Sequence, residues 1–284
     1  TKPLVLRFLQ STDAFANNAD TILSNVTIRN TADLTVGTHT LDFTIGSQVL
    51  LPGAGRPEIG SDYFILAVAD PANSILEDDS NPLNEDNTVA FVGAYSTATT
   101  MYLHGGKAAD NVTLMYPSTT SGNVTLGLNG SINATYSFAY RSITQFRVRT
   151  HGGNDTVNVV NSAKLAARPM LEFGGDGDDL LNGASGADTL NGGADDDTLS
   201  GGLGNDSLDG GSGTNSLSES GNVNFVVTNT RLTGVGTDTL AHLQIANLTG
   251  GASSNTFTVS GWTGGGTLDG GAGSADRIVV AHDT

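Results

Sequence analysis

The amino-acid sequence predicts an all-β protein, with a β-sandwich at the N-terminus followed by a parallel β-solenoid. Its 284 residues include 38 glycines and only three lysines, among many Asn, Thr and Ser residues. This composition is poor in helix formers and rich in strand and turn formers. Short segments of alternating polarity occupy the first part of the chain, and a nine-residue repeat occupies the middle.

The first part of the chain contains five segments that predict short strands separated by turn-forming residues. They cover residues 4–9, 22–28, 41–45, 63–68 and 88–92. Apolar and polar residues alternate in the first three, so each of these strands should bury one face. Strands of this length and spacing are typical of a β-sandwich. We therefore expect a sandwich over residues 1–95 and a solenoid over residues 96–284.

The end of the predicted sandwich resembles a known family. The sequence YFILAVAD (residues 63–70) is followed by PANSILE (71–77) and NEDNTV (84–89). This stretch is similar to the end of an immunoglobulin-like CARDB domain, a cell-adhesion-related domain of bacterial surface proteins. The resemblance implies an immunoglobulin-like fold for the sandwich and places the chain among proteins of the bacterial cell surface.

Further strands are predicted between the sandwich and the repeat. Residues 101–104, 111–116 and 123–126 predict short strands and are separated by Gly, Ser and Asn turns. Near residue 149, Phe146 and Val148 alternate with Arg147 and Arg149. We expect the two arginines to lie on a solvated strand face.

Five consecutive nonapeptides run from residue 174 to residue 218. Their sequences are GGDGDDLLN, GASGADTLN, GGADDDTLS, GGLGNDSLD and GGSGTNSLS. The sixth position holds Asp179, Asp188, Asp197, Asp206 and then Asn215, and the eighth holds Leu181, Leu190, Leu199, Leu208 and Leu217. A flexible Gly/Ser linker would explain the glycines, but it would not keep aspartates and leucines in phase.

Each nonapeptide predicts half a coil of a solenoid. Six glycine-rich residues form a tight turn, and the next three form a strand whose central Leu points inward. Two halves make a coil of about 18 residues, so one edge should stack Asp179, Asp197 and Asn215, and the other should stack Asp188 on Asp206. Without a cation these carboxylates would repel one another around a small core, so folding should require metal.

The repeat resembles the RTX, or hemolysin-type, calcium-binding nonapeptide, which forms a β-roll. Calcium accepts six to eight oxygen ligands, and glycine turns can supply carbonyls beside each carboxylate, whereas zinc would require His or Cys. The resemblance implies several Ca²⁺ ions held by the four aspartates of the sixth position. It also implies ligand carbonyls from the first and third positions, which are Gly174, Asp176, Gly183, Ser185, Gly192, Ala194, Gly201 and Leu203.

Departures from the repeat predict where the array weakens. Ala184 replaces a second-position glycine, Asp195 replaces a fourth-position glycine, and Asn215 replaces the last aspartate, so the fifth turn should bind weakly or close the array. Less regular coils should extend the solenoid on both sides, with Asp155 as an additional ligand and Asp276 as a weaker one.

A second candidate site lies at the end of the predicted sandwich. Residues 70–87 form an acidic loop that lacks the spacing of an EF-hand. A calcium ion there would be held by weaker candidates, namely Asp70, Glu77, Asp79 and Asp86. A merely solvated loop explains the same residues.

Charge and cysteine content limit the partners. The net charge of -17 disfavours nucleic acid and anionic membranes and favours a polyvalent cation, although acidity also serves solubility. Cysteine is absent, so bound metal would replace disulfides as the stabilising element of an extracellular protein. The chain begins at Thr1 directly before an apolar run, so we expect a processed product or a piece of a longer protein.

No motif of a zinc protease, a serine hydrolase or a nucleotide-binding loop occurs in the sequence. We therefore expect a non-catalytic, calcium-stabilised structural or adhesive module of an extracellular or cell-surface bacterial protein. Its partners would be copies of itself or neighbouring domains, stacked head to tail in a fibre. The alternative is a calcium-folded secretion module of a secreted hydrolase whose catalytic domain lies outside this chain.

Overall fold

The computed structural model describes residues 3–13, 16, 19–29, 47–53, 55–56, 61–69, 88–97, 99–117, 122–130, 132–160 and 168–281. β-Strands are the only regular secondary structure in these residues, which confirms the predicted all-β class. The chain forms two compact units, Thr1–Phe91 and Val92–Thr284. This division falls four residues before the expected one, because the strand Gly93–Thr97 pairs within the second unit.

The first unit contains a four-stranded antiparallel sheet. In spatial order its strands are β2 (Thr21–Ile28), β1 (Leu4–Ser11), β5 (Phe64–Ala69) and β6 (Thr88–Ala90). A two-stranded ladder joins β3 (Leu51–Pro52) to β4 (Gly55–Arg56). The predicted strand at residues 41–45 lies outside the described residues. Within the described part of this unit there is no second large sheet, so the immunoglobulin-like sandwich remains a prediction.

The second unit contains two large sheets whose inward faces share one hydrophobic core. In spatial order the nine-stranded sheet comprises β11 (Asn133–Ala139), β10 (Asn123–Asn129), β9 (Asn111–Met115), β13 (Thr156–Val160), β15 (Leu180–Asn182), β18 (Thr198–Ser200), β21 (Ser216–Ser220), β25 (Ile245–Thr249) and β27 (Gly265–Asp269). The eleven-stranded sheet comprises β28 (Arg277–Ala281), β26 (Thr256–Ser260), β22 (Phe225–Thr228), β23 (Arg231–Thr233), β24 (Thr237–Ala241), β20 (Ser207–Gly211), β17 (Thr189–Ala194), β14 (Met170–Asp176), β12 (Gln145–Gly152), β8 (Thr100–His104) and β7 (Gly93–Thr97). Two short strands, β16 (Ser185–Gly186) and β19 (Leu203–Gly204), pair separately.

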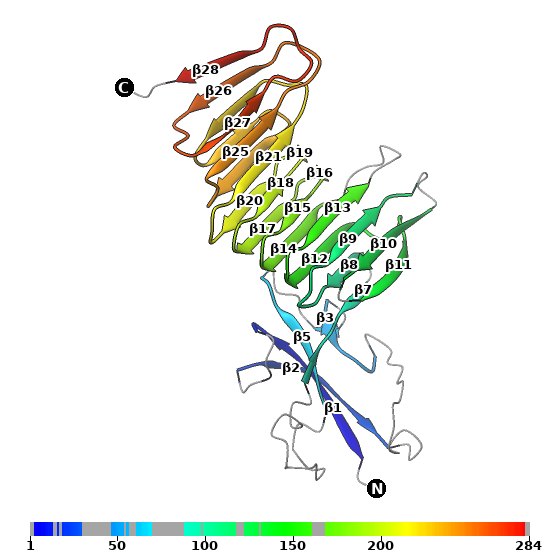
Figure 1. Ribbon diagram of the computed structural model, residues 1–284. Helices are drawn as coiled ribbons and strands as arrows, with labels where there is room; N and C mark the ends of the chain where they lie inside the picture. The colour runs from blue at the N-terminus through cyan, green and yellow to red at the C-terminus, as the bar shows by residue number, and fades with distance from the viewer. Residues whose placement is uncertain are drawn as a thin grey trace. The chain divides into compact units, whose positions relative to one another are not determined.

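From β12 onward the chain passes back and forth between the two sheets, and successive coils stack in parallel (Figure 1). Leu181 pairs with Leu199, and Leu190 pairs with Leu208, so one coil of the repeat contains 18 residues. This confirms the predicted parallel solenoid. Antiparallel strands complete its N-terminal end, where β11 pairs with β10 and β7 pairs with β8.

The five leucines of the repeat point inward, as predicted, and each is at most 1% exposed. Full burial of one leucine contributes about 1.5–3 kcal/mol. One such residue per half-coil makes a thin core, and the turns must therefore be stable as well. The less regular coils bury larger side chains in the same core, among them the stacked rings of Phe225 and Phe257.

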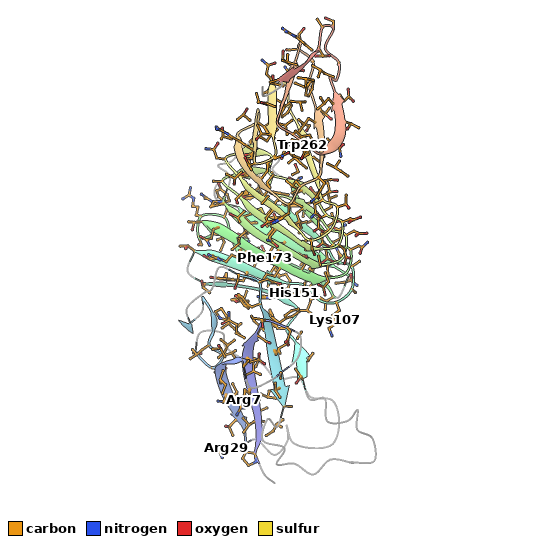
Figure 2. The ribbon with its side chains drawn as sticks, turned by 90° about the vertical axis from the view of Figure 1, so that its left-hand side faces the viewer. Arg7, Arg29, Lys107, His151, Phe173 and Trp262 are labelled. Atoms are coloured by element: carbon orange, nitrogen blue, oxygen red, sulfur yellow. The ribbon has the colours of Figure 1, made fainter. Side chains whose placement is uncertain are left out.

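The regular stacking changes after β21. The chain enters β22, returns antiparallel through β23, and only then places β24 beside β20. Trp262 follows β26 and packs partly against the core, and its indole N–H donates to the carbonyl of Gly265 at 3.1 Å. Figure 2 shows it in the C-terminal part of this unit.

The expectation that Arg147 and Arg149 lie on a solvated face is wrong for Arg149, which is 0% exposed. The predicted alternation of β12 is correct, because Phe146 and Val148 are in the core. Arg149 lies on the opposite face, where its guanidinium stacks on the ring of Phe173 at 5.2 Å. That face is aromatic rather than solvated. Its ring contacts join Tyr95 to Tyr102 and to His104, and His104 to His151.

Left-handed backbone in the turns explains the glycine columns of the repeat. Gly193, in a second position, has φ 119°, and Gly177, in a fourth position, has φ 115°. The replacements Ala184 and Asp195 keep this conformation, with φ 66° and φ 75°. A side chain at positive φ costs roughly 1–2 kcal/mol in an L-residue, and Asp tolerates it better than Ala.

Ala184→Gly should therefore stabilise the calcium-loaded protein by up to about 1 kcal/mol, since relief of strain exceeds the added entropy of the unfolded chain. Thermal unfolding in saturating calcium measures this. Ala194→Gly is the matched control, because Ala194 does not have a positive φ. This variant should lower the free energy of unfolding by roughly 0.5–1 kcal/mol. Equal losses in both variants would contradict the strain at Ala184.

Candidate metal centres

Two rows of turns connect the sheets and carry the acidic side chains. In the first row, each turn leads from the eleven-stranded sheet to the nine-stranded sheet, as between β14 and β15. In the second row, each turn leads back, as between β15 and β17. Because successive coils pair in register, equivalent turns of one row lie directly above one another.

Aspartates of the first row form a continuous ladder. The backbone N–H of Asp155 donates to Oδ1 of Asp179 at 2.8 Å, and that of Asp179 donates to Oδ1 of Asp197 at 2.9 Å. The N–H of Asp197 donates to Oδ1 of Asn215 at 2.8 Å. The structure therefore stacks Asp179, Asp197 and Asn215 at one edge, as the period predicted, and brings Asp155 into the same row.

The second row has the same geometry. The N–H of Met170 donates to Oδ1 of Asp188 at 2.8 Å, and the N–H of Asp188 donates to Oδ1 of Asp206 at 2.8 Å. The N–H of Asp206 continues the ladder to Oδ1 of Asp238 at 3.0 Å. Asp188 and Asp206 therefore stack as predicted, and Asp238 is a member of the row that sequence reasoning missed.

The second carboxylate oxygen of these side chains is buried and has no hydrogen-bond donor among the described residues. This is true of Oδ2 in Asp179, Asp188, Asp197, Asp206 and Asp238. The side chains are at most 3% exposed. Buried polar atoms are almost always paired, and an unpaired one costs about 1–3 kcal/mol. A row of such atoms indicates a bound cation that is coordinated by oxygen atoms.

Glycine at the first position of the turn leaves room for this oxygen. A Cβ added to Gly174 would collide with Oδ2 of Asp179 and with the carbonyl oxygen of Gly192 in the next coil. In the same way, a Cβ on Gly183 would collide with Oδ2 of Asp188. The space beside Gly174 is therefore bounded by two oxygens, one from a carboxylate and one from a carbonyl.

Asn215 shows what happens when the turn carries an amide instead. Its Oδ1 keeps its place in the ladder, and its Nδ2 donates to the carbonyl of His242 in the next coil at 3.2 Å. In the Asp179 turn the corresponding pair is Oδ2 and the carbonyl of Gly192, and two acceptors cannot bond to each other. A cation between them would satisfy both. These oxygens therefore fit a hard cation such as calcium.

Burial raises the pKa of the stacked aspartates above their usual range. Burial, together with the charge of neighbouring carboxylates, raises the pKa of Asp179 to about 8, that of Asp188 to about 7 and that of Asp197 to about 6. The pKa of Asp155 is raised to about 7 and that of Asp206 is raised, again by burial. The amides of the ladder act in the opposite direction, but burial outweighs them.

The predicted carbonyl ligands line the same turns. Several of these carbonyls already accept a hydrogen bond, among them Gly174 from the Thr150 hydroxyl, Asp176 from Gly153 N–H and Ala194 from Gly177 N–H. Each carbonyl oxygen has a second lone pair. The carbonyl of Gly183 accepts from Ser185 N–H. Ser185 pairs with Leu203 where β16 meets β19. Gly201 lies against Oδ2 of Asp206, and Gly192 lies in the same way against Oδ2 of Asp197.

The weaker candidates differ in placement. Asp276 is exposed, and its Oδ1 accepts from the N–H of Asn255 at 2.7 Å, so the ladder geometry recurs in the last coils. Asp70, Glu77, Asp79 and Asp86 lie outside the described residues. Asn215 belongs to the ladder but offers an amide where the others offer a free oxygen.

Sequence reasoning missed four buried carboxylates near the turns: Asp110, Glu172, Glu219 and Asp238. A signal for Asp238 was present, because Asp238-Thr239-Leu240 repeats the triplet Asp188-Thr189-Leu190 outside the nine-residue phase. Glu219 accepts from the N–H of Gly202 at 3.0 Å, and burial raises its pKa to about 7. Nothing in the pattern marked Glu172 or Glu219, since both occur where an apolar residue is expected.

No group of three or more His, Asp or Glu side chains converges as a metal-binding cluster within the described residues. The ladder explains this, because each turn contributes one carboxylate and the remaining oxygens come from the backbone. Calcium accepts such mixed oxygen sets.

The fold and these turns define a parallel β-roll with stacked cation sites. Residues 173–190 and 183–217 match the family model of the RTX calcium-binding nonapeptide repeat, in four copies. RTX nonapeptide repeats bind multiple Ca²⁺ ions and occur in secreted bacterial proteins. No curated protein and no solved structure matches the chain.

An exchange of Asp and Asn between turns tests the acceptor pair. Asp179→Asn should remove one bound calcium ion and raise calcium-free stability by about 1–3 kcal/mol, because its amide can donate to the carbonyl of Gly192. Asn215→Asp should do the reverse and lower stability in chelator. Isothermal titration calorimetry counts the ions, and urea unfolding in EGTA measures stability. A calcium-free Asp179→Asn chain less stable than the parent would contradict the assignment.

Stability of the calcium-free protein should fall as pH rises from 6.5 to 8.5. A carboxyl with a folded pKa above its unfolded value stabilises the fold at low pH, and this contribution is lost as pH rises through the folded pKa. Asp155, Asp179, Asp188 and Glu219 titrate in this window. Buried His104 and His151, with lowered pKa values, act in the opposite sense only below about pH 6.5.

Thermal melts in EGTA across this range measure the effect, and parallel melts in saturating calcium are the control. With calcium the carboxylates are held ionised, so the calcium-induced rise in melting temperature should be larger at pH 8.5 than at pH 6.5. A calcium-free melting temperature that stays constant or increases with pH over this interval would contradict the raised pKa values of these carboxyls.

Proposed function

We propose that this chain is a non-catalytic structural or adhesive module of an extracellular or cell-surface bacterial protein, folded and stiffened by calcium. The observation that carries the proposal is the double row of buried carboxylate oxygens without donors. When these carboxylates are ionised, the rows stabilise the coils only if a cation neutralises them. Extracellular calcium can supply that cation, and the chain has no cysteine for disulfides.

The ions would lie between stacked turns of each row. Asp179 and Asp197 would hold those of the first row, with Asp155 as an extension, and Asp188 and Asp206 those of the second. Carbonyls of the adjoining turns would complete the coordination. Asn215 would end the first row, because its amide already bonds to the next coil.

The C-terminal coil supports the proposed head-to-tail stacking. Ile278 and Val280 are 59% and 70% exposed, although they pair in register with Phe257 and Val259 on the inward side of the eleven-stranded sheet. Among the described residues no strand of the nine-stranded sheet lies beyond β27 to cover them. An open inward face of this kind fits another coil, from a neighbouring domain or from a second copy.

The first unit supports the adhesive part of the proposal through its antiparallel sheet, which is compatible with an immunoglobulin-like CARDB domain. No helix that could cross a membrane occurs in the part of the chain that the structure describes. The RTX repeats support a location at the cell surface or in the extracellular medium, where the module would act as a rigid segment.

Calcium titration of the chelated protein tests the proposal. Added calcium should increase the far-UV β-sheet signal, the melting temperature and the particle size measured by light scattering. Magnesium at the same concentration should have a much smaller effect, because it prefers rigid octahedral sites and retains water. If calcium leaves all three quantities unchanged, the module does not fold around calcium.

The assembly surface has its own test. The double variant Ile278→Asp and Val280→Asp should remain monomeric in calcium and keep the calcium-induced rise in melting temperature. Val226→Asp is the control, since Val226 is 37% exposed on β22 of the same sheet and alternates with inward-facing Phe225 and Val227. Self-association that persists unchanged in the double variant would exclude the C-terminal coil as the contact surface.

A further inference from the structure

A glutamate occupies the interior column of the solenoid. Glu172 on β14 pairs in register with Val148 on one side and with Leu190 on the other. Leu190 continues the column to Leu208 and Leu240, so Glu172 holds a position that is apolar in every neighbouring coil. Its side chain is 0% exposed.

Both carboxyl oxygens of Glu172 lack a hydrogen-bond partner, and no basic side chain forms an ion pair with it in the described part of the chain. An ionised carboxylate in an apolar interior is very costly unless a counter-charge reaches it. Leucine would fill the same column without this cost. A glutamate at this position is therefore stable only if its carboxyl binds a cation or carries a proton.

The second row of turns begins beside this residue. Met170 occupies the ladder position one coil before Asp188, where the row would otherwise carry an aspartate. The turn at Asp188 thus lacks a carboxylate from the preceding coil. Glu172 lies two residues after Met170 on the same strand and faces inward, and the charge of Asp188 is close enough to raise the pKa of Glu172 beyond the effect of burial.

Other oxygens converge at this turn. Oδ2 of Asp188 is buried without a donor, and a Cβ on Gly186 would lie 3.0 Å from Oδ1 of Asp188 and 3.3 Å from the carbonyl oxygen of Arg168. The Asp188 carboxylate and a carbonyl oxygen therefore lie at this turn, and Glu172 pairs in register with Leu190, two residues after Asp188. This donor set matches the hard oxygen ligands that calcium prefers.

We propose that Glu172 is a calcium ligand that reaches from the interior column to the second row of turns. Together with Asp188 it holds the first ion of that row and replaces the aspartate that Met170 displaces. The inference rests on the proposed calcium-folded solenoid and adds to it a site that lies outside the nonapeptide pattern. It also makes this first ion the most deeply enclosed of its row.

The test compares Glu172→Leu with the parent chain by calcium titration calorimetry and by thermal unfolding with and without EGTA. Glu172→Leu should bind one calcium ion fewer per chain and show a smaller calcium-induced rise in melting temperature. Its calcium-free melting temperature should exceed that of the parent, because leucine restores the apolar column. Glu172→Gln should keep the fold and weaken the affinity for one ion about tenfold or more.

Asp196→Asn is the matched control. Asp196 is exposed, its Oδ1 accepts from the N–H of Thr214 at 2.7 Å, and asparagine keeps that acceptor while removing one charge. This variant should bind as many ions as the parent.

If both Glu172 variants retain the full number of ions at unchanged affinity, Glu172 is a neutral interior acid and the inference is overturned, while the calcium-folded module stands. If the parent itself binds no calcium, the proposed function fails with it. The two failures are therefore distinguishable in one set of titrations.

Discussion

The solenoid depends on one electrostatic constraint, which is that carboxylate and carbonyl oxygens meet between stacked turns where no hydrogen bond can join them. One oxygen of each stacked aspartate is engaged by an amide of the preceding coil, as in the bond from Asp179 to Asp197. The other oxygen is buried and faces a carbonyl or another acceptor. An ionised carboxylate in such a pair is satisfied by a cation and not by a hydrogen bond, which couples the stability of the coils to cation binding.

The rest of the repeat follows from this arrangement. The first glycine of each turn is required because the carboxylate lies against its Cα, and the second and fourth positions require left-handed backbone. The single inward leucine fills a core too thin to hold the coils without the turns. Asn215 has the same geometry without a charge, since its amide donates to the carbonyl of His242 where an aspartate would need a metal ion.

Irregular features concentrate where the repeat begins and ends. Before it, Met170 and Glu172 exchange the expected polar and apolar positions, and Arg149 is buried against Phe173 on the outward face of β12. After it, the antiparallel return through β23 separates Asp206 from Asp238 by 32 residues instead of 18, yet the hydrogen bond between them is retained. The ladder therefore tolerates an insertion, because only the register of the strands has to be kept.

The sequence alone determined the β-roll, its 18-residue coil, the inward leucines and the two stacks of aspartates. A strict nine-residue period allows one arrangement in which equivalent positions of the repeat have the same surroundings in every coil. Only the tertiary structure brought Asp238 into the second row and placed Glu172 in the apolar column. Asp238 pairs across an interval of 32 residues instead of 18, so the spacing along the chain did not reveal it. Glu172 lies one 18-residue coil before Leu190, but an apolar residue was expected at that position, so only the observed pairing placed a carboxyl in the column. The tertiary structure also determined the burial of Arg149. Alternation of apolar and polar residues separates the two faces of a strand, but it does not show what covers each face.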